Sequence, residues 1–142
     1  MSRMSYTITL RIYQSNRKNF FRIVEKTAFG EGVWDESFGQ QVLTSSSSGN
    51  SGIIMFQDDN GERFTLVLGV HNYAPWTDTV TGVSPRDTAG VVIAQYYNNG
   101  PRAWAREKTW ISHTATSSTG TRCSVNFTNT EGHDLKAQLY IE

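Results

Sequence analysis

The chain has 142 residues, enough for one domain with a single core, and one domain over residues 1–142 is expected. Its 13 Lys and Arg residues balance 13 Asp and Glu residues, which argues against nucleic acid and anionic membrane surfaces as partners. Charged residues make up 18% and aromatic residues 12%, which excludes charge-driven disorder and disfavours a long helical protein. Abundant Ser, Thr, Asn and Gly indicate a β-rich fold with small-residue turns.

The first half of the chain predicts five strands. Residues 6–13 alternate between apolar and polar side chains, as a half-buried strand does. The other four strands are expected at residues 20–25, 40–44, 53–56 and 63–73. The segment around Trp34 and the serine-rich tract 45–52 are predicted to be loops. Asn60-Gly61 lies between two strand-like runs and predicts a tight hairpin.

The second half predicts two helices followed by three strands. Ser84 and Pro85 are typical of a helix N-cap and first turn, so a helix is expected from there until just before Asn98. A second helix is expected from Pro101 to Glu107. The final strands are expected at residues 110–116, 122–129 and 135–141. The prediction is therefore a mainly β domain interrupted by a helix-loop-helix.

The single cysteine and the lack of long apolar stretches indicate where in the cell the protein is located. Cys123 is the single cysteine, which excludes an intrachain disulfide, and a buried packing role is its simplest interpretation. The N-terminal residues contain no apolar run typical of a signal peptide. No stretch approaches the ~20 apolar residues of a membrane span. A cytoplasmic location is therefore expected.

The sequence gives little support to catalysis or to a metal centre. His71, His113 and His133 lack the spacing that places two ligands on one face of a strand or helix. The paired carboxylates Asp58 and Asp59 occupy an expected turn, where acidic residues are common because they are solvated. No catalytic residue, metal or cofactor is therefore expected.

Neutral hydrogen-bonding residues gather beside aromatic ones in three expected loops. These are residues 45–52, residues 71–73, and residues 76–81 together with Arg102. Sugars present hydroxyl groups that both donate and accept, together with apolar faces that suit aromatic side chains. This composition favours a carbohydrate ligand, and a plain connecting role for the serine-rich loop is the alternative.

Six segments also follow one another in a recognisable order. They are YTITLRIYQ (6–14), FFRIVEKT (20–27), GVHNY (69–73) with Trp76, YYNNGPRA (96–103), EK (107–108) and TEGHDLKA (130–137). In this order they resemble the fungal fruit-body lectin family, the mushroom and bolete lectins. The resemblance extends over nearly the whole chain, so it is far more specific than any single motif.

The resemblance implies a fold and a function. The fold is a two-sheet β-sandwich connected by a helix-loop-helix, similar to that of the actinoporin toxins. The resemblance further implies a homotetramer without metal or enzyme activity and with two sugar sites in each subunit. One site takes galactose and N-acetylgalactosamine-type sugars, including the Thomsen–Friedenreich disaccharide, and the other takes N-acetylglucosamine.

Transferred by position, the galactose-type site comprises residues from three segments. They are Ser48, Gly49, His71, Asn72 and, through a backbone contact, Gly30. A Ser hydroxyl and an Asn amide could bind an axial 4-hydroxyl that an equatorial epimer does not present. Without the resemblance, His71 would be interpreted as a packed strand histidine. The loop at residues 28–33 is shorter than the corresponding family loop.

The N-acetylglucosamine site transfers in the same way. Its residues are Asp78, Thr79, Thr81, Arg102 and His113, with His113 standing where the family has a tyrosine. Asp78 would accept from a sugar diol and Arg102 would donate, and a surface ion pair between the two is the alternative. Because imidazole titrates near neutral pH, binding at this site is expected to depend on pH.

The favoured function is a non-catalytic, multivalent lectin with a defence or storage role, whose partners are glycans and glycoproteins. A membrane-active cytolysin of the actinoporin type is the alternative, but the strand expected from residue 6 leaves no N-terminal amphipathic helix to insert. A glycosidase would need two carboxylates about 5–10 Å apart across a sugar, and no such pair is evident.

Overall fold

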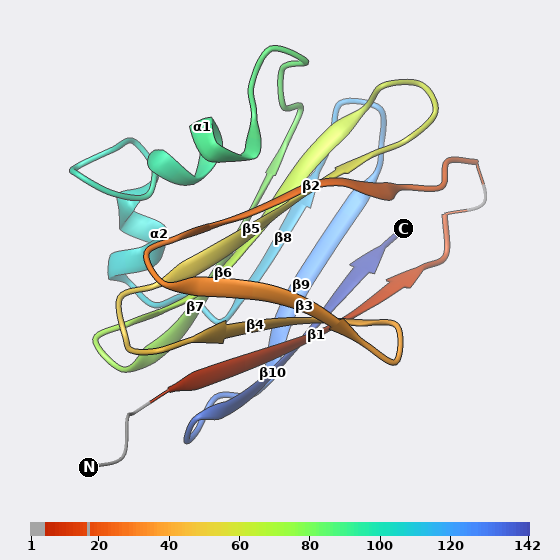
Figure 1. Cartoon of the computed structure of the whole chain (residues 1–142). Helices are drawn as coiled ribbons and strands as arrows, with labels where there is room; N and C mark the ends of the chain where they lie inside the picture. Colours follow the sequence, from red (N-terminus) through yellow and green to blue (C-terminus); the bar gives the residue numbers. More distant parts are fainter. Residues whose placement is uncertain (1–4, 17) are drawn as a thin grey trace.

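Alternating side chains build a six-stranded sheet in which the first and last strands of the chain are neighbours. The computed structural model describes residues 5–16 and 18–142. The strands of this sheet, in the order β3-β4-β1-β10-β9-β8, are β3 (Gly32–Ser37), β4 (Gln40–Ser45), β1 (Tyr6–Gln14), β10 (Asp134–Ile141), β9 (Arg122–Asn129) and β8 (Ser112–Thr116). β1 and β10 pair in parallel, and the other neighbours are antiparallel. Figure 1 shows β1 and β10 side by side.

A four-stranded antiparallel sheet packs against the first sheet and completes a sandwich. Its order is β2 (Arg22–Phe29), β5 (Ser51–Gln57), β6 (Arg63–His71) and β7 (Ala74–Thr81). The expected mainly β, two-sheet architecture is confirmed.

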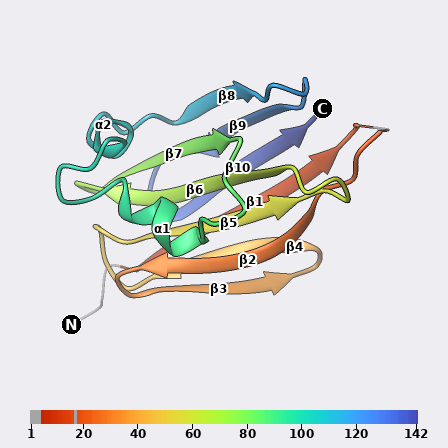
Figure 2. The same ribbon diagram turned by 90° about the horizontal axis from the view of Figure 1, so that it is seen from above.

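Both faces of the four-stranded sheet are buried. Leu66 and Leu68 of β6 point into the main core, where they pack with Leu10 and Leu139 of the other sheet. Val67, between them, points the opposite way into a second core beneath the helices. Figure 2 shows α1 in front of this sheet and α2 near the ends of β7 and β8. Burial on two faces explains why β5 is apolar at successive positions rather than at alternate ones.

The helices are shorter than expected, and their starts differ from the prediction. Residues 84–87 form a turn, in which the Asp87 N–H donates to the Ser84 carbonyl at 3.0 Å. Helix α1 (Ala89–Ala94) begins later because Thr88 caps it, accepting from the Val91 N–H at 3.2 Å. Helix α2 (Ala103–Glu107) likewise begins after the turn at residues 101–102.

Two segments expected to be loops are strands. The region around Trp34 forms the edge strand β3, and the Trp34 indole donates to the Thr27 carbonyl at 2.8 Å. Residues 76–81 belong to β7, which pairs in register with β6. The strand expected at residues 63–73 ends instead at His71, because Asn72 and Tyr73 form a two-residue hairpin with φ of 48° and 66°.

The Asn60-Gly61 hairpin and the buried Cys123 are confirmed. β5 and β6 are antiparallel neighbours, and Gly61 has the positive φ of 85° that a tight turn requires. Cys123 lies on β9 with no exposed surface, and burial raises the pKa of its thiol to about 12. The thiol is therefore a packing group.

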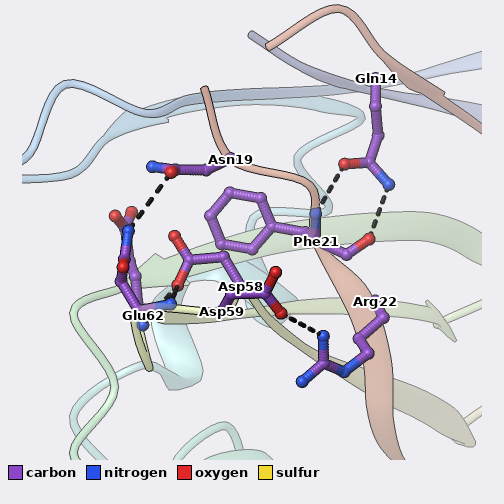
Figure 3. Close-up of polar contacts among 8 residues, drawn as sticks. Gln14, Asn19, Phe21, Arg22, Asp58, Asp59 and Glu62 are labelled. Atoms are coloured by element: carbon purple, nitrogen blue, oxygen red, sulfur yellow. Dashed lines mark hydrogen bonds and ion pairs between the residues drawn. The ribbon is translucent and has the colours of Figure 1, made fainter. Parts of the chain in front are cut away.

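Hydrogen bonds from polar side chains stabilise the end of the sandwich that carries the β5–β6 turn (Figure 3). The Asp58 carboxylate accepts from the N–H groups of Asn60 and Glu62 at 3.0 and 2.8 Å. The Gln14 side chain forms two hydrogen bonds with the backbone of Phe21, donating at 2.7 Å and accepting at 2.9 Å. These contacts fix the β1–β2 connection and the β5–β6 turn. Within the described residues, no helix is long and apolar enough to span a membrane.

Close packing around Gly69 gives a test of the second core. An added Cβ at Gly69 would lie 2.6 Å from the Trp76 indole nitrogen and 2.7 Å from the Ser51 Cβ. Gly69→Ala is therefore expected to lower the free energy of unfolding by about 1–3 kcal/mol, measured by urea denaturation. Gly90→Ala in α1 is the control, since its nearest neighbour is 3.6 Å away, and it is expected to stabilise by up to ~1 kcal/mol. Equal effects of the two substitutions would contradict this account.

Candidate sugar-binding sites

Three chain connections meet at one end of the four-stranded sheet. They are the β2–β3 turn, the β4–β5 loop and the β6–β7 hairpin, and the pairing of Phe29 with Ser51 and of Ser51 with Gly69 aligns them. The turn site is defined here as Gly30, Ser48, Gly49, His71 and Asn72. The structure places all five predicted residues at these connections.

A backbone hydrogen bond holds Ser48 against the β6–β7 hairpin. The Tyr73 N–H donates to the Ser48 hydroxyl oxygen at 2.9 Å, so the hydroxyl hydrogen remains available to another acceptor. Asn72 occupies the left-handed position of the hairpin that asparagine tolerates well, and it is exposed. The loop and the hairpin therefore present a hydroxyl and an amide close together.

The two glycines of the turn site matter because they carry no side chain, which leaves space for other groups. The Gly49 N–H already donates to the Val70 carbonyl at 2.8 Å, but no atom lies within 4 Å of a Cβ added there. A ligand can therefore approach the backbone at Gly49. At Gly30 an added Cβ would lie 2.0 Å from the Asn50 side-chain oxygen. The buried Asn50 amide in turn donates to the Ser45 hydroxyl at 2.8 Å, so Gly30 makes room for the group that orders the serine-rich loop.

Burial and the contact with Arg106 of α2 both favour the neutral form of His71. The guanidinium donates to His71 Nδ1 at 3.0 Å and to the Tyr96 carbonyl at 2.8 Å. Burial lowers the pKa of His71, and the Arg106 charge lowers it further, against a smaller opposite effect of Glu107. The neutral ring accepts at Nδ1 and carries its proton on Nε2. The Asn72 amide nitrogen, 3.4 Å from Nε2, is also a donor, so both N–H groups remain free for a ligand oxygen.

Residues of the helix-loop-helix form the wall behind the turn site, and sequence reasoning missed them. The Tyr97 ring stacks on Phe29 with centroids 3.6 Å apart, and the Arg106 guanidinium lies 4.8 Å from the Tyr97 centroid. The Tyr97 hydroxyl is 2.5 Å from the Ser51 hydroxyl. No spacing in the sequence pairs these residues, because the sheet and the helices meet only in the folded chain.

The second candidate site centres on a buried carboxylate. The helix site is defined here as Asp78, Thr79, Thr81, Arg102 and His113. Asp78 is 1% exposed, and its Oδ2 accepts from the Tyr96 hydroxyl at 2.7 Å. Burial and the Asp78 charge raise the pKa of Tyr96, so this hydroxyl keeps its proton and donates. His113 Nε2 lies 3.5 Å from Asp78 Oδ1.

The structure corrects the surface ion-pair interpretation of Asp78 and Arg102. Asp78 is buried, and among the described residues its basic neighbour within 4.0 Å is His113. Arg102 instead donates through Nε to the Gln95 side-chain oxygen at 3.0 Å. Strand alternation places Thr79 and Thr81 on the face of β7 opposite Asp78, and the buried Thr79 hydroxyl has no hydrogen-bond partner among the described residues. The structure therefore brings together Asp78 and His113 but not the two threonines.

Two exposed tryptophans extend the surface beside His113. Trp104 and Trp110 are each 39% exposed, and their rings meet edge to face with centroids 4.8 Å apart. The Thr77 N–H donates to the Trp110 carbonyl at 2.8 Å, which ties this segment to β7. The strand expected at residues 110–116 begins instead at Ser112, so Trp110 precedes β8. The Trp110 ring centroid is 6.0 Å from that of His113. An exposed indole next to polar groups suits a sugar face.

Comparisons with known proteins identify the family. The family model described as fungal fruit body lectin matches residues 4–139. The chain belongs to the fungal fruit body lectin family. This lectin is 49% identical over 140 residues to Boletus edulis lectin from Boletus edulis, an alignment that covers 96% of this chain and 98% of that protein. The family resemblance read from the sequence is confirmed.

Solved structures confirm the fold of this lectin. A substituted variant of the Xerocomus chrysenteron lectin superposes with a TM-score of 0.96 at 46% identity, covering 99% of this chain and 100% of that one. The wild-type Xerocomus chrysenteron lectin gives a TM-score of 0.95 at 46% identity, with 98% and 100% coverage. Its family relatives make this protein a carbohydrate-binding lectin. In the described part of the chain, no three His, Cys, Asp or Glu side chains are grouped to hold a metal ion.

The contact between Arg106 and His71 gives a second prediction. Arg106→Gln removes the nearby positive charge, so the pKa of His71 is expected to rise toward its ordinary value. Imidazole ¹⁵N chemical shifts followed against pH measure this change. Lys108→Gln is the control, because this exposed residue follows the same helix and forms no hydrogen bond with His71 in the described part of the chain. An unchanged titration of His71 in Arg106→Gln would contradict the assigned cause.

Proposed function

We propose that this lectin binds sugars without catalysis at two separate sites in each subunit, the turn site and the helix site. The observation that carries this proposal is the convergence of three connections on free hydrogen-bond donors: the Ser48 hydroxyl, the Asn72 amide and His71 Nε2. The Ser48 oxygen is held by the Tyr73 N–H and His71 Nδ1 by Arg106, so these two groups lose little conformational entropy when a sugar binds.

The turn site is proposed to bind galactose and N-acetylgalactosamine-type sugars, including the Thomsen–Friedenreich disaccharide. Donors on the hairpin and the loop could bind an axial 4-hydroxyl that an equatorial epimer would direct elsewhere. The open space at Gly49 allows a ring to approach the backbone closely. Gly30 supports this site indirectly, because the absence of a side chain there leaves room for Asn50.

The helix site is proposed to bind N-acetylglucosamine. Asp78 Oδ1 faces His113 and can accept from a sugar hydroxyl, while the Arg102 guanidinium has further N–H groups besides the one bound to Gln95. Trp110 lies next to His113 and offers an apolar surface to a sugar ring. Thr79 and Thr81 enter this proposal from the family resemblance, and their placement across the strand favours a backbone contribution over a side-chain one.

The biological role proposed is defence or storage, by agglutination of cells or glycoproteins. Two weak sites in each subunit of a homotetramer would give avidity without any new contact. A single domain over residues 1–142 and a cytoplasmic location belong to the same proposal. The relatives reported above are lectins, and they give no support to the membrane-active alternative.

Substitution of one residue in each site separates the two specificities. Asn72→Ala removes an amide donor and is expected to weaken galactose-type binding about tenfold, with N-acetylglucosamine binding unchanged. Arg102→Ala is expected to do the reverse. Glycan arrays and calorimetry measure both effects, and Arg86→Ala, at an exposed loop position, is the control. If neither substitution weakens any sugar, the two-site assignment is wrong.

A matched pair of hydroxyl deletions tests the buried carboxylate. Tyr96→Phe removes the donor to Asp78 and is expected to cost ~1–3 kcal/mol of unfolding free energy, because a buried carboxylate loses a partner. It is also expected to weaken N-acetylglucosamine binding and to spare galactose-type sugars. Tyr97→Phe removes only the contact with Ser51 and serves as the control. Equal losses of N-acetylglucosamine binding in the two variants would rule out a specific role for Tyr96.

A further inference from the structure

A groove of about 530 Å³ crosses the outward face of the six-stranded sheet. This volume lies within the usual range of ligand sites, about 300–1,000 Å³. The sheet groove runs over β4, β1, β10 and β9, away from the helices. Its polar lining consists of Thr9, Arg11, Gln40, Thr128, Asp134, Lys136 and Gln138. It shares no residue with the turn site or the helix site.

Irregular strand pairing accompanies the groove. The register between β9 and β10 shifts between Lys136 and Ala137, as at a β-bulge. Bulges bend a strand and increase its twist, and they redirect side chains. The Thr128 hydroxyl donates to the Lys136 carbonyl at 3.4 Å next to this shift. The outward face of the sheet is therefore not flat at Lys136.

Arg11 is held in place within the groove. The orientation of the Gln40 amide that satisfies its neighbours places the Gln40 oxygen 2.7 and 3.2 Å from Arg11 Nε and Nη2, which donate to it. Arg11 Nη1 also lies 3.5 Å from the Tyr13 hydroxyl. A guanidinium fixed in this way keeps free N–H groups for a planar anion.

Neither cation of the groove has a carboxylate partner in the described part of the chain. The ion pairs there, at a limit of 4.0 Å, join Arg22 to Asp59, Lys26 to Glu36 and His113 to Asp78. The parallel register places Thr9 opposite Lys136 and Gln138 opposite Arg11, so the two cations lie on adjacent strands about two residues apart. Asp134 also lines the groove, two residues from Lys136 along β10, and its position opposite Thr7 places it at the end away from Arg11.

Two aromatic rings border the Arg11 end of the groove. Tyr13 and Tyr140 face each other across β1 and β10 and stack with centroids 4.9 Å apart. Each is 38% exposed. Exposed tyrosines, threonine hydroxyls and a Gln amide are the groups that recognise sugar rings, and the two unpaired cations add a preference for negative charge.

We propose that the sheet groove binds an acidic saccharide, whose carboxylate or sulfate group lies between Arg11 and Lys136. The hydroxyls of Thr9 and Thr128 and the Gln138 amide bind the sugar hydroxyls. This is a third site, chemically distinct from the two neutral-sugar sites, and it does not depend on them. Because two cations bind the anion, affinity falls as salt rises.

The experiment compares 3′-sialyllactose and 3′-sulfolactose with neutral lactose by calorimetry. Asn72→Ala/Arg102→Ala is the background, so that neutral-sugar binding does not mask the acidic site. Both acidic probes are expected to bind more tightly than lactose, whose residual binding at the turn site is weak in this background. Added Arg11→Gln or Lys136→Gln is expected to weaken the acidic probes about tenfold, whereas Arg86→Gln is the control and leaves them unchanged. The stronger of the two probes identifies the anionic group.

A titration of the unsubstituted lectin removes any dependence on the folding of variants. Backbone amide shifts at Thr9 and Gln138 are expected to move with the acidic probes and not with lactose. The proposal is overturned if no acidic probe binds, or if Arg11→Gln and Lys136→Gln bind it as well as the background does. It is also overturned if Arg11→Gln changes the oligomer mass while acidic probes stay unbound, because a second copy would then cover this face. Failure here leaves the turn and helix sites untouched.

Discussion

Burial of the four-stranded sheet on both faces is the constraint on which the two candidate sites depend. One face packs against the six-stranded sheet, and the other needs a cover, which α1 and α2 supply over Val67 and Trp76. This cover brings Arg106 to His71 and Tyr96 to Asp78, so each site pairs a strand residue with a helical-segment residue. The helix-loop-helix therefore completes the core and organises the sites in one step.

Much of the fold could be predicted from the sequence because alternation and turn chemistry are local. The strands at residues 6–13 and 122–129 and the Asn60-Gly61 hairpin are of this kind. The edge strand β3 was missed because its exposed acidic residues resemble a loop, and only its pairing with β4 makes it a strand. β7 was missed because Thr77, Asp78 and Thr79 are typical of a polar loop, although all three are buried in the folded chain.

The candidate sites were predictable only in part. Their positions came from the resemblance, and the structure gathers the turn-site residues at one sheet end. The protonation states of the site side chains were not predictable, because they depend on contacts between distant segments, such as that of Arg106 with His71. Asp78 shows the same limit: on sequence grounds it could pair with Arg102 at the surface, whereas folding buries it beneath Tyr96 and His113.

The parallel pairing of β1 with β10 affects how the chain can fold. β10 lies between β1 and β9, so the half-sheet β3-β4-β1 has no neighbour on one side until β10 inserts. The chain between β1 and β10 is long, so bringing the two strands together costs conformational entropy before any contact between them forms. Such topologies fold slowly. On the ribosome, β1 must remain an unpaired edge throughout synthesis of the middle of the chain. The exposed strand is then open to pairing with another nascent chain, a hazard that ends when β10 emerges.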